Sequence, residues 1–318
     1  MKEVGGYFEL ELPKKNEYHF SAVKLNSARN AFKYILMAQS IRKVYIPAYI
    51  CDSMIQPLID LKINYEFYNI NSDFEIDNAP LLRTGEKILY VNYFSLKGDY
   101  IKNLSVAYGE SLIIDGSQAF YEKPLKNIDT IYSPRKFFGV SDGGYLYTQH
   151  RLDWNLKQDN SEDFAKHLVG RLLKGAKEYY KDFQMSELNL SSQPVKVMSN
   201  ITRRILTSID YESVSRKRVG NFNFLLDALK DLNTLPLSQV DNTPFAYPLL
   251  TSDLKLRQKL IENGIYVPSY WREVAFRDNA SEVEKDFSER LLLIPIDQRY
   301  DASDMQDVVS IIKENINA

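Results

Sequence analysis

Two nearby segments decide the fold: SLIIDGSQAF at residues 111–120 and TIYSPRKFFGVSDGGYLYT at residues 130–148. Each opens with a short run of apolar, β-branched or aromatic residues, which is typical of a buried strand. Polar residues follow each run, Asp115 after the first and Lys136 after the second. Ligands in open α/β sheets bind beyond the carboxyl ends of the strands. The pattern therefore predicts a binding site around Asp115 and Lys136.

Each of these two side chains has an ordinary explanation and a functional one. Asp115 could cap the next helix or form an Asx turn, or its carboxylate could hold a protonated ring nitrogen while Gln118 bonds an adjacent polar atom. Lys136 could be a surface lysine whose stem covers the aromatic residues. Alternatively, Phe137 and Phe138 desolvate its amine, which lowers the pKa and suits a nucleophile that forms Schiff bases. Neither residue alone decides between the explanations.

A helix start at NSARNAF (26–32) offers a seat for phosphate, because the first N–H groups of a helix lack intrahelical partners and carry partial positive charge. The alternative is an ordinary Ser or Asn cap. Ser133 could also reach a phosphate, and Arg135 could add positive charge. Together, a phosphate seat, an aspartate and a lysine after successive strands are the parts that a pyridoxal phosphate site needs.

Composition excludes several other classes of function. The chain has 318 residues, 44% hydrophobic and 26% charged, with a formal net charge of -2, so it can bury a sizeable core and has no global field that favours nucleic acid. A single cysteine, Cys51, rules out an intrachain disulfide, and with three scattered histidines it argues against a metal site. No signal-like amino terminus and no apolar run of about 20 residues is present. We expect a cytoplasmic protein that does not bind membranes.

The rest of the chain alternates between strand and helix patterns up to residue 148. Strands are expected over 43–50, 64–70, 87–94, 111–116, 130–133 and 144–148, and helices over 27–40 and 53–62. Residues 161–232 have a helical pattern with a polar loop at 186–194, and an α+β unit follows. The alternation predicts an α/β fold with a mostly parallel central sheet and flanking helices. We expect a large domain over 1–205, whose N-terminal segment packs on a smaller C-terminal domain over 206–318.

Several of these segments resemble the DegT/DnrJ/EryC1/StrS family of sugar aminotransferases, which have the type I fold of enzymes that depend on pyridoxal phosphate (PLP). The resemblance runs through most of the chain in the family's order. Its main segments are NSARNA (26–31), VYIPAYICDS (44–53), NYEFYNINSDFEID (64–77), VNYFSLKG (91–98), IIDGSQAF (113–120), SPRKFFGVSDGGYLYT (133–148), MSNITRRIL (198–206) and LLLIPIDQRYDASDMQDVVSIIKE (291–314). Asp142-Gly143-Gly144 stands where the family more usually has Glu-Gly-Gly, and we interpret the two glycines as a tight turn.

The resemblance implies a role for each candidate residue. Lys136 would be the Schiff-base residue, Asp115 would bind the pyridine nitrogen and Gln118 would lie near the ring oxygen. The phosphate would be held by Ser27, Ala28, Arg29 and Ser133. Tyr49 would stack on the ring, since Cys51 stands near the position where the family often has an aromatic residue.

The implied activity is PLP-dependent amino transfer from an amino-acid donor to a keto sugar carried on a nucleotide, for surface polysaccharide or glycoside synthesis. The implied assembly is a homodimer with shared active sites, completed by a partner loop near 186–194 or Asn200. Two alternatives remain at this point. One is a PLP-dependent sugar dehydratase, against which Lys136 argues because such relatives tend to have histidine there. The other is a non-catalytic regulatory or scaffold protein that retains the fold.

Overall fold

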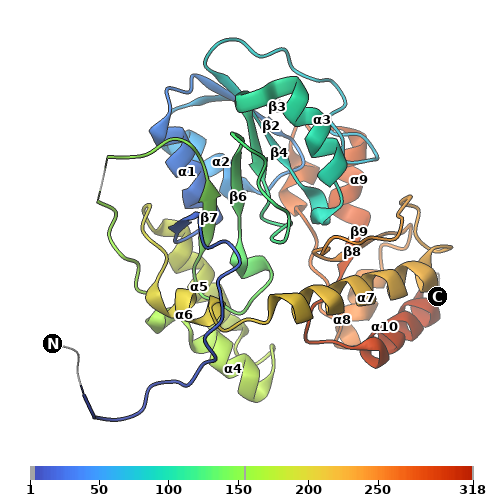
Figure 1. Cartoon of the computed structure of the whole chain (residues 1–318). Helices are drawn as coiled ribbons and strands as arrows, with labels where there is room; N and C mark the ends of the chain where they lie inside the picture. The colour runs from blue at the N-terminus through green and yellow to red at the C-terminus, as the bar shows by residue number, and fades with distance from the viewer. Residues whose placement is uncertain (1–3, 154, 317–318) are drawn as a thin grey trace.

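A computed structural model describes residues 4–153 and 155–316. A seven-stranded sheet forms its centre, with the strand order β1-β7-β6-β5-β4-β2-β3 (Figure 1). The strands are β1 (Val23–Leu25), β2 (Lys43–Pro47), β3 (Asn64–Tyr68), β4 (Glu86–Val91), β5 (Leu112–Asp115), β6 (Asp129–Tyr132) and β7 (Gly144–Tyr147). Strands β3, β2, β4, β5 and β6 pair in parallel, and β7 is antiparallel to both β6 and β1. The mostly parallel sheet predicted from the sequence is confirmed.

Strands β4 and β5 lie in the interior of this sheet, and both of their faces are buried. The side chains from Ile88 to Val91 and from Leu112 to Asp115 are all buried. A strand that is covered on both sides has a continuous apolar run instead of an alternating one. The parallel register of β4, β5 and β6 brings their carboxyl ends to one edge of the sheet.

Helices flank the sheet and extend into the second half of the chain (Figure 1). They are α1 (Ala28–Ala38), α2 (Asp52–Asp60), α3 (Gly98–Tyr108), α4 (Lys166–Lys174), α5 (Tyr180–Ser192), α6 (Asn200–Leu206), α7 (Tyr211–Leu229), α8 (Leu256–Glu262), α9 (Glu282–Arg290) and α10 (Ala302–Asn315). Helix α1 packs on β6 and β7, whereas α3 packs on β5. Two of these helices begin at capping boxes, formed by Ser281 with Glu284 at α9 and by Asp301 with Asp304 at α10.

The C-terminal third forms an α+β unit around a second, two-stranded sheet. Its strands are β8 (Tyr247–Leu250) and β9 (Leu291–Ile294), which pair antiparallel. Helices α7, α8 and α10 surround this sheet, and their buried residues form an apolar cluster of their own. The α+β character predicted for this part of the chain is confirmed, while the division at residues 205/206 stays a prediction.

One predicted segment differs from the structure: residues 186–194 were expected to form a loop, but α5 continues to Ser192. The polar run SELNLSSQ suggested a loop, yet it contains Leu190, which is buried. The guanidinium of Arg29 also donates a hydrogen bond to the carbonyl of Ser191 at 2.9 Å, near the end of the helix. Tertiary packing and this bond outweigh the weak helix propensity of serine and asparagine.

No helix in the described part of the chain is both long enough and apolar enough to span a membrane. Within residues 4–153 and 155–316, no group of three or more His, Cys, Asp or Glu side chains is arranged to hold a metal ion.

Candidate active site

Asp115 and Lys136 lie at the same edge of the central sheet. Asp115 is the last residue of β5, and Lys136 ends a 3-10 turn, η3 (Pro134–Lys136), that follows β6. Because β5 and β6 are parallel neighbours, both residues occupy the carboxyl edge where α/β folds bind ligands. The positive charge of Lys136 acts on the Asp115 carboxyl and opposes part of the rise in its pKa. The two segments therefore meet at this edge, and the binding site around them stays a prediction.

Asp115 is a buried carboxylate with one oxygen engaged locally. Only 5% of its surface is exposed, and Oδ1 accepts a hydrogen bond from the backbone N–H of Ser117 at 2.9 Å. This hydrogen bond forms the Asx turn, which was one of the two explanations for Asp115 in the sequence. Burial raises the pKa of the carboxyl, although Ser117 and Lys136 each lower it. A cationic group beside the carboxylate would stabilise its charge in this poorly solvated position.

Gln118 is also buried, and its side chain supports the turn that follows β4. Its Oε1 accepts a hydrogen bond from the backbone N–H of Phe94 at 2.9 Å. Phe94 and Ser95 both have left-handed backbone, with φ of 57° and 67°. Because this conformation is costly for residues other than glycine, the bond from Gln118 helps to hold it. Gln118 thus links the segment after β5 to the segment after β4 at the same edge.

Lys136 points toward Tyr270, a residue of the C-terminal unit that no sequence pattern indicates. The Lys136 amine donates a hydrogen bond to the Tyr270 hydroxyl at 3.3 Å, and Nζ lies 4.7 Å from the centre of that ring. Lys136 is exposed to water, in contrast to its buried neighbours Phe137 and Phe138. The protein atoms packed around its amine partly desolvate it and so lower its pKa, but Tyr270 and Cys51 raise the pKa more, so it is raised overall. The lysine is therefore held by specific contacts and remains accessible.

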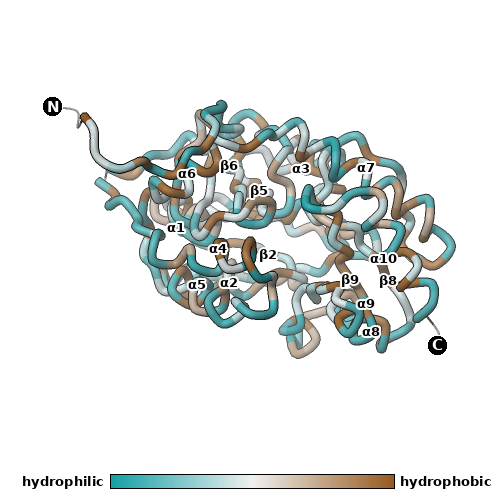
Figure 2. The backbone as a smooth tube through the Cα atoms, turned by 90° about the horizontal axis from the view of Figure 1, so that it is seen from below, coloured by the Kyte–Doolittle hydropathy of each residue, from teal (hydrophilic) through white to brown (hydrophobic). Residues whose placement is uncertain are grey.

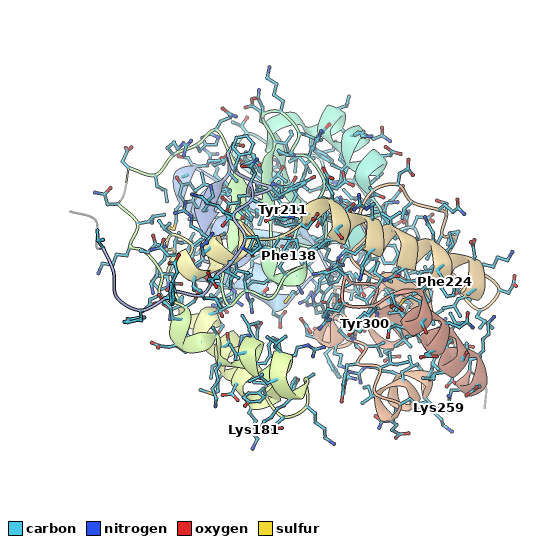
Figure 3. All side chains as sticks on the ribbon, turned by 60° about the horizontal axis from the view of Figure 1, so that its bottom comes forward. Phe138, Lys181, Tyr211, Phe224, Lys259 and Tyr300 are labelled. Atoms are coloured by element: carbon cyan, nitrogen blue, oxygen red, sulfur yellow. The ribbon has the colours of Figure 1, made fainter. Side chains whose placement is uncertain are left out.

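The two phenylalanines fix the lysine loop from the opposite side. Phe137 packs under the guanidinium of Arg218, whose central carbon lies 4.6 Å from the centre of the ring. The carbonyl of Phe137 accepts a hydrogen bond from Gln298 at 2.9 Å. Phe138 packs edge-to-face on Tyr211 with 5.5 Å between ring centres, and Figure 3 labels both residues beside each other. The apolar side chains anchor the loop, so Lys136 alone is free to project from it.

The loop that carries Lys136 also contains Ser133 and Arg135, and both contact other parts of the protein. Arg135 forms a short ion pair with Glu187 of α5, and burial lowers the pKa of its guanidinium to about 10. Ser133 is buried at the end of β6, and its carbonyl accepts a hydrogen bond from the Lys136 N–H at 3.4 Å. Arg135 thus ties the lysine loop to α5, and the predicted phosphate contact of Ser133 stays a prediction.

The two glycines that follow the lysine loop bring it against the start of α1. The N–H of Gly143 donates to the carbonyl of Asn26 at 2.7 Å, and Gly143 has a φ of 127°, which favours glycine. A Cβ on Gly144 would lie 2.4 Å from the backbone carbon and oxygen of Ser27. The glycines therefore allow a close backbone approach to α1, which adds a reason for them beyond the tight turn that we inferred.

Asp142, just before these glycines, is the buried anchor of α6. Its carboxylate accepts hydrogen bonds from the Ser161 hydroxyl at 2.9 Å, from the Ser199 hydroxyl at 2.6 Å and from the Ser199 N–H at 2.7 Å. The hydroxyl of Thr202 donates a further short bond. Ser199 is the N-cap of α6, so the negative charge also lies at the positive end of a helix dipole. The acidic residue of the motif holds the loop to the protein core.

The residues predicted to bind phosphate at α1 have clear structural contacts. Ser27 is the N-cap and accepts a hydrogen bond from the Asn30 N–H at 3.1 Å. Ala28 is the first residue of the helix. The Arg29 Nε donates to the carbonyl of Ser53 at 3.1 Å, which is the carbonyl that Pro57 cannot bond because proline has no N–H. Arg29 therefore joins α2 and α5 to α1.

Tyr49 is completely buried next to the segment that carries Tyr270. Its hydroxyl forms a short hydrogen bond to the carbonyl of Tyr270, and its ring contacts Trp271 edge-to-face at 5.0 Å between centres. Burial raises the pKa of Tyr49 well above its ordinary value. Tyr270 is itself stacked between Phe245 and Trp271, at 6.2 and 5.6 Å. No local pattern of the sequence could have selected Tyr270, because it lies 134 positions from Lys136.

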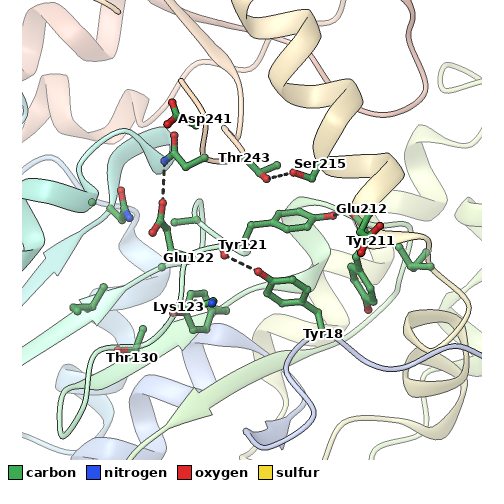
Figure 4. Close-up of a pocket in the computed structure, with 18 of the residues that line it drawn as sticks. Tyr18, Tyr121, Glu122, Lys123, Thr130, Tyr211, Glu212, Ser215, Asp241 and Thr243 are labelled. Carbon is green, nitrogen blue, oxygen red and sulfur yellow. Dashed lines mark hydrogen bonds between the residues drawn. The ribbon is translucent and has the colours of Figure 1, made fainter. Parts of the chain in front are cut away.

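A separate cavity of about 1110 Å³ opens elsewhere, between β5, β6 and the start of α7 (Figure 4). Tyr18, Tyr121 and Glu122 line it, and the Tyr18 hydroxyl donates to the carbonyl of Tyr121 at 2.8 Å. Neither Asp115 nor Lys136 lines this cavity. Ile114 and Gly116, on either side of Asp115, do line it, so the cavity adjoins β5 without including the two candidate residues.

No protein-family model and no curated protein sequence matches the chain. Solved structures do match it. A DegT DnrJ EryC1 StrS aminotransferase from Brucella abortus is 17% identical, with 93% of this chain and 86% of that chain covered and a TM-score of 0.65. The sugar aminotransferase CalS13 from Micromonospora echinospora is 14% identical, with 92% and 87% covered and a TM-score of 0.66. The chain has the sugar-aminotransferase fold.

A third matched structure is NtdA from Bacillus subtilis with bound cofactor PMP, the pyridoxamine form of PLP, which is 15% identical. It is matched over 92% of this chain and 72% of that chain, with a TM-score of 0.65. This sugar-aminotransferase fold is the type I fold that the sequence predicted. In it, Asp115, Gln118 and Lys136 come together at one sheet edge, and the start of α1 is joined to the lysine loop through Gly144.

Proposed function

We propose that the protein is a PLP-dependent aminotransferase that transfers an amino group from an amino acid to a keto sugar carried on a nucleotide. The observation that carries this proposal is the accessible amine of Lys136 at the sheet edge it shares with the buried carboxylate of Asp115. The matched structures support it, because they include sugar aminotransferases and one that was solved with PMP. The nucleotide, the keto sugar and a role in polysaccharide synthesis are proposed from the resemblance of the sequence to the family.

The residues at the sheet edge fit PLP in their chemistry. An amine, a buried carboxylate and the N-terminus of a helix are what an aldehyde, a basic ring nitrogen and a phosphate require. The backbone N–H groups of Ala28 and Arg29 open α1, where helix geometry gives them no intrahelical partner. The close approach of Gly144 to Ser27 keeps this helix start next to the lysine loop. Ser133, buried at the end of β6, supplies a further hydroxyl on the same loop.

When bound, PLP supplies a ring that accepts electrons and so lets an amino group leave one carbon skeleton and join another. Asp115 would hold a proton at the pyridine nitrogen, because a cation there would relieve the cost of its buried charge. Lys136 would hold the cofactor through its amine, and the same amine would then be placed to move a proton between the α-carbon of the donor and the cofactor. The Tyr270 hydroxyl accepts a hydrogen bond from Lys136 and so orients its amine. Gln118 would lie near the ring, and Tyr49, which is completely buried, would support the segment that carries Tyr270.

We also propose a cytoplasmic homodimer with shared active sites, and a division into domains at 1–205 and 206–318. The contacts of Lys136 support the division, because the lysine belongs to the sheet-bearing part and Tyr270 to the C-terminal part. Amino-acid donor and sugar would bind between the two parts. The ion pair of Arg135 with Glu187 supports a role for α5 in positioning the lysine loop.

The test begins with purified protein and added PLP. We expect visible absorption from bound cofactor, and reduction with borohydride should attach the cofactor to Lys136, as peptide mass spectrometry of residues 133–148 would show. The Lys136→Ala variant should fold and lose this attachment, while Lys102→Ala, an exposed position on α3, should keep it. Absence of any spectral change in wild-type protein would reject both enzyme functions and leave the non-catalytic alternative.

If the cofactor binds, glutamate and other amino donors should convert it to the amine form. Failure with every donor would instead favour the sugar dehydratase. The sugar can then be sought by offering nucleotide-linked keto sugars to the amine form and following the return of the original absorption.

A further inference from the structure

The hairpin of α4 and α5 exposes its apolar side. Few large apolar residues face the interior: His167 and Gly170 of α4 and Ser186 and Leu190 of α5 are the buried residues of these two helices. Gly170 is required there because the ring of Tyr179 lies where a Cβ would be, at 2.2 Å. The outward residues form what we call the hairpin face, with exposed fractions from 40 to 85%: Val169, Leu172, Leu173, Tyr180, Phe183, Met185 and Leu188. A pair of helices with this orientation is stable in water only when another surface covers it.

A second exposed apolar element is the segment near the N-terminus. Residues 4–11, which we call the arm, are exposed at every position and extend away from the body (Figures 1 and 2). Tyr7 is 100% and Phe8 95% exposed. The arm is attached at its base, where Arg204 donates to the carbonyl of Leu12 at 2.9 Å and the Lys15 N–H donates to the carbonyl of Thr207 at 2.6 Å. The base is thus fixed, while Tyr7 and Phe8 are almost completely exposed.

The charges of the two elements are complementary. The arm sequence YFELEL places Glu9 and Glu11 between apolar residues. In the described part of the hairpin, ion pairs occupy Lys166 and Lys174, whereas Arg171, Lys177 and Lys181 are exposed and have no acidic partner. Lys181 lies on the outer side of α5 (Figure 3). An apolar and acidic segment therefore matches an apolar and basic surface.

We propose that the arm of one copy of this chain binds the hairpin face of a second copy, and that the exchange is reciprocal. This inference rests on the proposed homodimer and identifies its contact surface. The base of the arm and the hairpin lie on the same side of the molecule (Figure 1), so a two-fold axis closes the exchange into a dimer. Both apolar elements are covered by this one arrangement.

The area is sufficient for a stable dimer. Buried aromatic side chains remove about 150 to 250 Å² each from water, so Tyr7 and Phe8 account for roughly 300 to 500 Å² per arm. Two arms and the two surfaces that receive them then reach about 1,200 to 2,000 Å², which is the range of standard stable interfaces. The basic and apolar hairpin would also suit an anionic membrane, but an acidic arm would not. The arm therefore favours a second copy over a lipid surface.

This contact reaches the candidate site through α5. Glu187 lies on α5 and holds Arg135, the residue next to Lys136. An arm that covers α5 fixes this helix, and the ion pair passes that restraint to the lysine loop. The second copy thereby completes the support of the residue that binds the cofactor.

The first test is the molar mass of the full-length chain in solution, by sedimentation or light scattering. We expect a dimer. Tyr7→Ser/Phe8→Ser and Leu172→Ser/Leu173→Ser should each raise the dimer dissociation constant at least about 30-fold. The matched control Leu81→Ser/Leu254→Ser changes two equally exposed leucines elsewhere and should leave the constant unchanged. Circular dichroism verifies that each variant folds. A monomeric wild type, or a dimer that survives either double substitution of arm or hairpin, overturns the proposal.

A crosslinking experiment decides whether the contact is between chains. In a Cys51→Ser background, one copy carries Phe8→Cys and the other Leu172→Cys, and the two are mixed under mild oxidation. A disulfide between the different copies supports the proposal. Its absence, with a disulfide that forms within one chain when both substitutions are combined, overturns it. Binding of monomeric wild type to phosphatidylglycerol vesicles overturns it in favour of a membrane surface. None of these readouts depends on PLP, so the proposed enzyme activity succeeds or fails separately.

Discussion

Lowering the pH is expected to destabilise the protein through one buried histidine, His19. Only 2% of its surface is exposed, and its ring stacks on Tyr132 with 4.4 Å between ring centres. Nε2 lies 2.7 Å from the carbonyl of Phe120, which can only accept, so this nitrogen carries the hydrogen and donates it. Nδ1 is then the acceptor for the Tyr147 hydroxyl at 3.1 Å. A second proton, on Nδ1, removes this acceptor and buries a charge.

Burial lowers the pKa of His19 from 6.5 to about 4, although the bond to Phe120 partly opposes the change. Between these two values the unfolded chain binds more protons than the folded one, so stability falls as the pH falls. The contribution of His19 is fully present above pH 6.5. It decreases by about 2 kcal/mol between pH 8 and pH 5, and by about 3 kcal/mol once the pH is below 4.

The assay is urea unfolding at pH 8 and pH 5, with wild type and His19→Gln compared. The amide of glutamine can donate to the carbonyl of Phe120 and accept from Tyr147, but it does not titrate. Every other residue is the same in the two proteins, so the difference between the two pH responses isolates His19. We expect wild type to lose about 2 kcal/mol more than the variant between the two pH values. Equal losses in the two proteins would refute the reasoning.

Three further substitutions test the site. Gly144→Ala should lower the free energy of unfolding by about 1 to 3 kcal/mol, because the new Cβ meets backbone at the start of α1. The control Gly220→Ala in α7 meets nothing within 4 Å and should raise the free energy of unfolding by about 0.5 to 1 kcal/mol. Equal urea midpoints for the two variants would contradict this. Asp142→Ala should cost about 3 kcal/mol, since four donors lose their acceptor, and a loss below about 1 kcal/mol would count against the anchor. Tyr270→Phe should lower the pKa of the Lys136 amine, because the hydroxyl raises it; the pH dependence of Lys136 acetylation measures this, and an unchanged profile would be inconsistent with the contact.

The fold could be predicted from the sequence because its determinants are local. Runs such as LIID at 112–115 show where strands are buried on both faces, and parallel neighbours necessarily bring Asp115 and Lys136 to one edge. The contacts of the site could not be predicted in the same way. Tyr270 reaches Lys136 from another sheet-bearing unit, and its position depends on how the two units pack. The polar run at 186–194 became helix for the same reason: its stability comes from packing and from the bond of Arg29.

Gly144 shows why the role of a residue can depend on a distant segment. From the sequence, Gly143 and Gly144 indicate a turn, and any flexible pair would serve. In the structure, Gly144 is specific, because a Cβ there would lie within 2.7 Å of the Ala28 nitrogen and even closer to Ser27. The glycine therefore sets the separation between the proposed phosphate seat and the lysine loop, which are about 110 positions apart in the sequence. A larger residue would move one half of the site relative to the other without changing any residue that touches the cofactor.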